Sequence, residues 1–66
     1  MFKMSPDAFV TALKIARSLT DHSDHREWQA KISEICAVMQ SENPKTSTKY
    51  LKDLAACYLA GIMLYT

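Results

Sequence analysis

Glycine and proline are scarce in this chain: one glycine and two prolines stand among 66 residues. Both residue types interrupt helices and supply tight turns, so their scarcity disfavours a fold of short strands. A hydrophobic fraction of 48% and a charged fraction of 23% are typical of a folded globular chain. The composition therefore predicts one all-α domain that spans residues 1–66.

Excess charge and long apolar runs are also missing. The net charge is only +1, whereas dedicated nucleic-acid-binding modules usually carry a clear basic excess. No run approaches the roughly 18 to 20 apolar residues of a membrane span. The first residues, MFKMSPDAF, lack the apolar core and cleavage site of a secretory signal. We expect a soluble, cytoplasmic protein.

Cysteine is present twice, as Cys36 and Cys57, which is too few for the dense disulfide framework of small secreted domains. Both residues fall on predicted core faces, where we expect reduced thiols that pack as small hydrophobic groups.

His22 and His25 lie together in the segment DHSDH, but zinc fingers pair their cysteines two to four residues apart. We expect neither a metal nor a cofactor.

Motifs of catalysis are absent as well. The chain has no glycine-rich phosphate loop, no nucleophile elbow and no close pairing of a nucleophile with histidine. We therefore expect a protein that is not an enzyme.

Three segments carry helical patterns. Ser5-Pro6-Asp7 is a strong helix start, which predicts a first helix over about 6–20. Its expected core face consists of Phe9, Ala12, Leu13, Ala16 and Leu19, with Ile15 beside them. Val10 lies off that stripe, either as a flank of the core or as an exposed apolar contact.

The second helix is predicted over about 24–41. Asp24 and Glu27 have the spacing of a capping box, and Pro44 disfavours helix in the residue before it. The apolar stripe is regular and consists of Trp28, Ile32, Ile35, Cys36 and Met39.

The third helix, predicted over about 47–64 with Thr46 or Ser47 as its cap, is apolar on two faces. Its second half belongs to the thirteen residues 54–66, which carry no charge. One face suits the core and consists of Tyr50, Leu54, Cys57, Tyr58, Gly61 and Tyr65. The opposite face carries apolar side chains where a monomer would place polar ones, namely Ala56, Leu59, Ala60 and Met63, with Leu64 on its edge.

This second face is the best functional lead. A contiguous exposed apolar patch usually marks an interaction site, and a twofold homodimer is the commonest way to cover one. The alternative is that this helix is central and covered on both sides by the other two. We expect a protein interface, and therefore a three-helix domain with short loops that oligomerisation completes.

A basic strip is the second lead. Lys45, Lys49 and Lys52 recur at i, i+4 and i+7 on the side of the apolar face. They would steer an acidic partner surface or contact phosphate, or they form an ordinary solvated helix end. Lysine at a helix N-terminus opposes the helix dipole, so these charges are not there for helix stability.

These features predict a small non-enzymatic protein-binding protein, such as an adaptor, an inhibitor or regulator, or a co-chaperone. Its partner would be a second copy of itself, another protein, or both. The alternative is a dimeric nucleic-acid-binding regulator that uses Lys45, Lys49 and Lys52.

Overall fold

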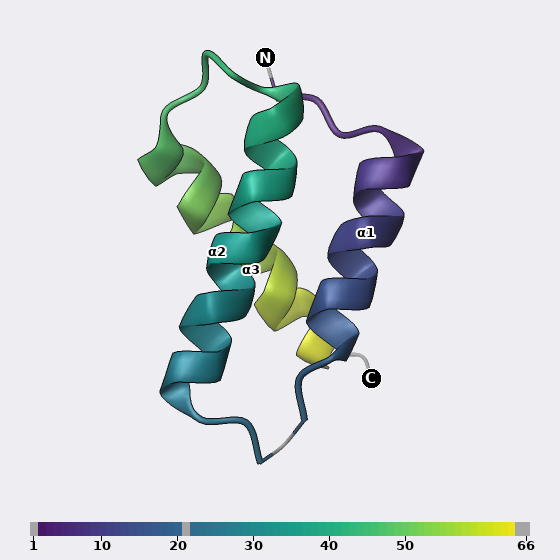
Figure 1. Ribbon diagram of the computed structural model, residues 1–66, viewed down its shortest axis with the longest axis vertical. Coiled ribbons are helices and arrows are strands. Elements are labelled where there is room, and N and C mark those ends of the chain that lie inside the picture. Colours follow the sequence, from purple (N-terminus) through teal and green to yellow (C-terminus); the bar gives the residue numbers. More distant parts are fainter. Residues whose placement is uncertain (1, 21, 65–66) are drawn as a thin grey trace.

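The chain folds into three helices in two layers. The computed structural model describes residues 2–20 and 22–64, which contain α1 (Pro6–Arg17), α2 (His25–Glu42) and α3 (Thr48–Leu64) and no strand. α1 and α2 lie side by side and antiparallel, and α3 crosses behind both of them (Figure 1). The all-α class and the three predicted segments are confirmed.

α1 begins where the sequence predicts and ends early. The Ser5 hydroxyl accepts a hydrogen bond from the Ala8 N–H at 3.1 Å, and Pro6 is the first helical residue. The helix ends at Arg17 and not near Thr20, because the next two N–H groups bond three residues back, to Ile15 and Ala16. This tighter turn brings Leu19 into the core, where it is 5% exposed.

Both later helices begin at a capping side chain. The Asp24 carboxylate accepts from the Glu27 N–H at 2.9 Å and caps α2. The Ser47 hydroxyl accepts from the Tyr50 N–H at 3.2 Å, directly before α3. Each cap satisfies an N–H group that has no partner inside its own helix. Of the two predicted caps for α3, Ser47 is the one observed.

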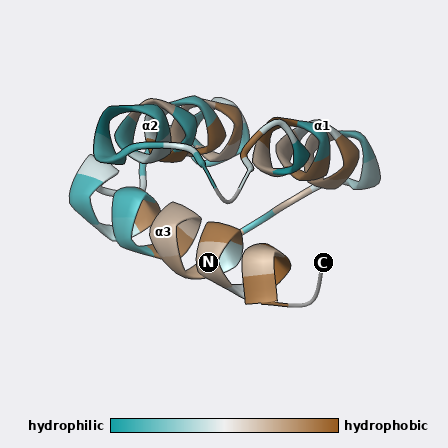
Figure 2. Cartoon of the chain, turned by 90° about the horizontal axis from the view of Figure 1, so that it is seen from below, coloured by the Kyte–Doolittle hydropathy of each residue, from teal (hydrophilic) through white to brown (hydrophobic). Residues whose placement is uncertain are grey.

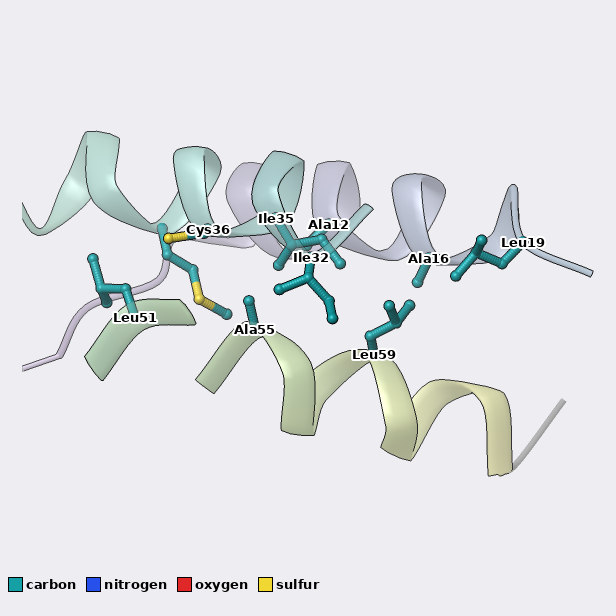
Figure 3. Close-up of a cluster of buried hydrophobic side chains, with 10 residues drawn as sticks. Ala12, Ala16, Leu19, Ile32, Ile35, Cys36, Leu51, Ala55 and Leu59 are labelled. Atoms are coloured by element: carbon teal, nitrogen blue, oxygen red, sulfur yellow. The ribbon is translucent and has the colours of Figure 1, made fainter. Parts of the chain in front are cut away.

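The core lies between the two layers (Figure 3). α2 contributes the stripe that the sequence predicts, with Trp28 packed at its edge. α1 contributes small residues, and α3 contributes two leucines and an alanine. The buried cluster consists of Ala12, Ala16, Leu19, Ile32, Ile35, Cys36, Met39, Leu51, Ala55 and Leu59.

α1 faces the core with Ala12 and Ala16, as predicted, but Phe9 does not join them. Ala8, Ala12 and Ala16 are buried at four-residue spacing, whereas Phe9 is 47% exposed and Leu13 is half-buried. Alanines at this spacing let helix backbones approach closely, so the bulkier side chains turn to the flank. The prediction that Phe9 belongs to the core is wrong, and Val10 is an exposed apolar residue.

The N-terminal segment is tied to the end of α2 by four hydrogen bonds. The buried Asn43 accepts from the Lys3 N–H and donates to the Lys3 carbonyl, both at 2.7 Å. Glu42 accepts from the Ser5 N–H at 2.7 Å and from the Ser5 hydroxyl at 2.5 Å. These bonds hold the segment so that Phe2 and Met4 pack against the core.

None of the described helices is long and apolar enough to cross a membrane.

Candidate functional site

α3 packs a different side against the core than the sequence predicts. Leu51, Ala55 and Leu59 are fully buried against the other two helices. Cys57 precedes Leu59 by two residues, which turns its side chain about 160° around the helix. Cys57 is accordingly exposed, and the Tyr50 side chain is 51% exposed. Tyr50 and Cys57 therefore point outward, whereas Leu54 and Tyr58 of the same expected core face still pack against the core.

The physical reason lies in the side chains of the two faces. Leu51, Ala55 and Leu59 have no polar side-chain atoms, and the small Ala55 lets α3 approach α2. On the other face, burial of Tyr50 would require a partner for its hydroxyl, and Gly61 offers no side chain to bury. The inward face therefore gains more from burial than the outward face would.

The predicted interface residues do not share one environment: some lie in the core and some on the surface. Leu59 is 0% exposed and belongs to the core, so its assignment to an interface is wrong. Ala56 and Met63 are half-buried and pack against the core. Ala60 is exposed, and Leu64 is 80% exposed. Only Ala60 and Leu64 of the predicted set are fully available to a partner.

A line of apolar and small residues lies on the outer side of α3, although Leu54 among them also packs against the core. We call this line the outward seam, and it consists of Tyr50, Leu54, Cys57, Gly61 and Leu64. Successive members are four, three, four and three residues apart. Leu54 and Gly61 are half-buried, and the other three are exposed. In Figure 2 the first turns of α3 are coloured as hydrophilic and the later turns as mostly hydrophobic.

Gly61 leaves the outward seam without a side chain at one position. It lies inside α3, where glycine costs about 1 kcal/mol relative to alanine. A Cβ placed on Gly61 would meet no atom within 4 Å, and no glycine has a positive φ angle in the described residues. Within the described residues, neither packing against another side chain nor a positive φ angle therefore accounts for glycine at this position.

The edge of α1 borders the outward seam. The rings of Phe9 and Tyr58 meet edge to face at 5.7 Å between their centroids. The Tyr58 hydroxyl donates a long hydrogen bond, 3.5 Å, to the Phe9 carbonyl. Partial burial raises the pKa of the Tyr58 hydroxyl. This contact extends the exposed apolar surface from α3 onto Phe9 and the neighbouring Val10.

The three lysines lie at the N-terminal end of α3, and all are exposed. Lys45 precedes the helix, which begins at Thr48, so the lysines do not form one helical strip. Lys52 lines a hollow of about 300 Å³ between α2 and α3. Lys52 thus lies on the α2 side of α3, away from the outward seam.

The two cysteines do not meet. Cys36 is buried, and its thiol lies 3.9 Å from the Thr48 carbonyl oxygen, whereas Cys57 is exposed. Both are free thiols, but the prediction of a core position holds only for Cys36. Within the described residues no group of three His, Cys, Asp or Glu side chains could hold a metal ion. Asp21 and Tyr65, named in the sequence patterns, lie outside the described residues.

Comparison of the chain with protein-family models, curated proteins and solved structures finds no match.

Proposed function

We propose that this chain is a small, non-enzymatic protein-binding protein, such as an adaptor or regulator, that acts through the outward seam of α3. The observation that carries the proposal is the exposure of apolar side chains in line on one helix, with Leu64 at 80%. Water contact with such a surface is unfavourable, and a partner protein relieves it.

The chemistry of the seam supports a binding role. Its side chains offer aliphatic surface, one phenol and one thiol. These groups suit contact with another apolar surface, where aromatic side chains often act as anchors. Tyr50 is the aromatic anchor in this proposal.

The experiment that tests the proposal compares two double variants. Cys57→Lys with Leu64→Lys places charge on the exposed seam, and Ala30→Lys with Ala37→Lys places the same charge on the exposed side of α2. Immobilised wild-type and variant chains are incubated with lysate of the source organism, and the retained proteins are quantified by mass spectrometry. Self-association of the same chains is measured by sedimentation.

We expect the seam variant to lose a retained protein or its own self-association, while the α2 variant keeps it. High salt should change this binding little, because apolar contacts dominate it. Equal behaviour of the wild type and the seam variant in both measurements would contradict the proposal.

The lysines have a supporting role in this proposal. Lys45, Lys49 and Lys52 steer an acidic partner surface toward α3 and so raise the association rate. Changing all three to Glu should slow association about ten-fold at low salt and leave dissociation nearly unchanged. If the wild type instead retards duplex DNA or RNA at physiological salt and this triple variant does not, the lysines contact phosphate and the nucleic-acid alternative is correct.

A further inference from the structure

We propose that the occupant of the outward seam is a second copy of this chain, with the two α3 helices packed antiparallel about a twofold axis. This inference rests on the proposed function, because it names the partner that covers the same seam.

The spacing of the seam is that of a coiled coil. Alternating steps of four and three residues keep a stripe of side chains facing a partner helix. Tyr50, Cys57 and Leu64 occupy one type of heptad position, and Leu54 and Gly61 occupy the other. α3 is therefore patterned to pack inward on its own domain and outward on a second helix.

One twofold axis pairs large residues with small ones. If the axis lies level with the middle of the Ala55–Ala56 peptide, Tyr50 faces Gly61 of the second copy, and Leu54 faces its Cys57. Both pairs arise from the same axis, because the two members of each pair are equally distant from it along the sequence. Alternation of large and small residues across facing positions is what fills a helix interface without voids.

The antiparallel arrangement explains why residue 61 is a glycine. Among the described residues, nothing outside its own stretch of helix lies within 4 Å of a Cβ at this position, and Tyr50 is 51% exposed on the same face. The Tyr50 ring of the second copy fills the space above Gly61, which a larger side chain would occupy.

The charges favour the antiparallel direction. Lys49 lies in the first turn of α3 and Lys45 just before the helix, and both are exposed where they oppose the dipole of α3. In an antiparallel pair this end lies beside the C-terminal half of the other α3, where the negative end of the helix dipole attracts cations. The same complementary contact occurs twice, as twofold symmetry requires.

A parallel pair fails on each of these points. It would place the two Lys49 residues at the same end of the pair, and it would set Gly61 against Gly61 with a void between them. It would also set the two Tyr50 rings against each other. The 17 residues of α3 span about 25 Å, so the interface is small and the dimer should depend on protein concentration.

The first test is sedimentation of the full chain over a concentration series. Gly61→Leu fills the space that receives Tyr50 and should raise the dimer dissociation constant about ten-fold or more. Ala30→Leu adds the same side chain to an exposed position of α2 and should leave the constant unchanged. Circular dichroism checks that both variants keep their helical content. A wild-type chain that is monomeric throughout, or a dimer that tolerates Gly61→Leu, overturns the inference.

The second test fixes the direction of the helices by oxidative crosslinking. In Leu54→Cys, residue 54 of one copy faces Cys57 of the other, so a mixed disulfide between positions 54 and 57 should form in the dimer. Mass spectrometry of the crosslinked peptides identifies the pair. A wild-type dimer that crosslinks readily through Cys57 to Cys57 would show a parallel arrangement and overturn the inference.

The inference and the proposed function fail in different ways. If the wild type is a monomer but retains another protein that the Cys57→Lys, Leu64→Lys variant loses, the seam binds a different chain. The proposed function then stands, and the second copy is excluded as the occupant. If the wild type neither dimerises nor retains a seam-dependent protein, both fail.

Discussion

The Asn43 side chain forms hydrogen bonds with both the N–H and the carbonyl of Lys3, forty residues earlier in the chain. Its side-chain oxygen accepts from the Lys3 N–H and its side-chain nitrogen donates to the Lys3 carbonyl, each at 2.7 Å. The same nitrogen donates to the Met39 carbonyl at 2.8 Å, so the amide joins the N-terminal segment to the last turn of α2. Asn43 is the only polar or charged residue that is buried in the described chain.

Asn43→Ala should lower the free energy of unfolding by about 2 kcal/mol, because it removes three hydrogen bonds of a buried amide. Urea unfolding monitored by circular dichroism measures the loss. Ser41→Ala is the matched control, since Ser41 is exposed and its hydroxyl bonds only to the nearby Val38 carbonyl. A loss in Asn43→Ala no larger than in Ser41→Ala would show that the Lys3 contact is not stabilising.

The Ser5–Glu42 contact predicts a dependence of stability on pH. Hydrogen bonds from the Ser5 hydroxyl, and then from its N–H, lower the pKa of Glu42 from 4.5. A carboxylate with a lowered pKa in the folded state contributes stability above the pKa of the unfolded state. That contribution is lost as the pH falls through the folded value.

Glu42→Gln should therefore lower the melting temperature at pH 7, and the difference from the wild type should shrink well below pH 4.5. Thermal unfolding of both chains between pH 7 and pH 3 gives the comparison. Glu34→Gln serves as the control, because Glu34 is exposed and pairs with Lys31 on the surface of α2. A constant difference over the whole range would contradict the role of the ionised Glu42.

The helix starts and the apolar stripe of α2 could be predicted because each has a local cause. Asp24 stands three residues before Glu27, which is the spacing of a helix cap. α2 has only one apolar side, so the sequence shows which side of this helix is buried. The contacts of Lys3 and Ser5 with the end of α2 could not be predicted, since no local pattern links residues about forty positions apart.

The outward seam required the structure because α3 is apolar on two sides. A helical repeat of apolar residues counts Tyr50 and Cys57 in the same way as leucine or alanine, so it does not distinguish the two apolar sides of α3. Packing against α1 and α2 decides which side is buried. The sequence predicts a surplus apolar face on this helix, and the structure exposes only some of the residues named for it. Of the residues named for it, Leu64 is the most exposed large hydrophobic residue, and Leu59 lies in the core.

Two leucines on α3 test which face is buried. Leu59→Ala should cost about 2 to 5 kcal/mol of unfolding free energy, because it leaves a cavity in the core. Leu64→Ala should change the stability of the dilute monomer by no more than about 0.5 kcal/mol. Urea unfolding at low protein concentration compares the two variants. Equal losses would show that α3 does not pack as described.

The two thiols should differ in reactivity because only one of them faces solvent. Cys57 is exposed on the outward seam, and Cys36 is buried beneath α3. At dilute, monomeric concentrations an alkylating reagent should modify Cys57 quickly and reach Cys36 only when the domain opens, which slows that reaction by the folding equilibrium. In urea that unfolds the chain, the alkylation rates of Cys36 and Cys57 should become similar. The Cys57→Ser variant should lose the fast phase of alkylation and keep the slow one. If Cys36 instead reacts as fast as Cys57 in the native chain, α3 does not cover this part of α2.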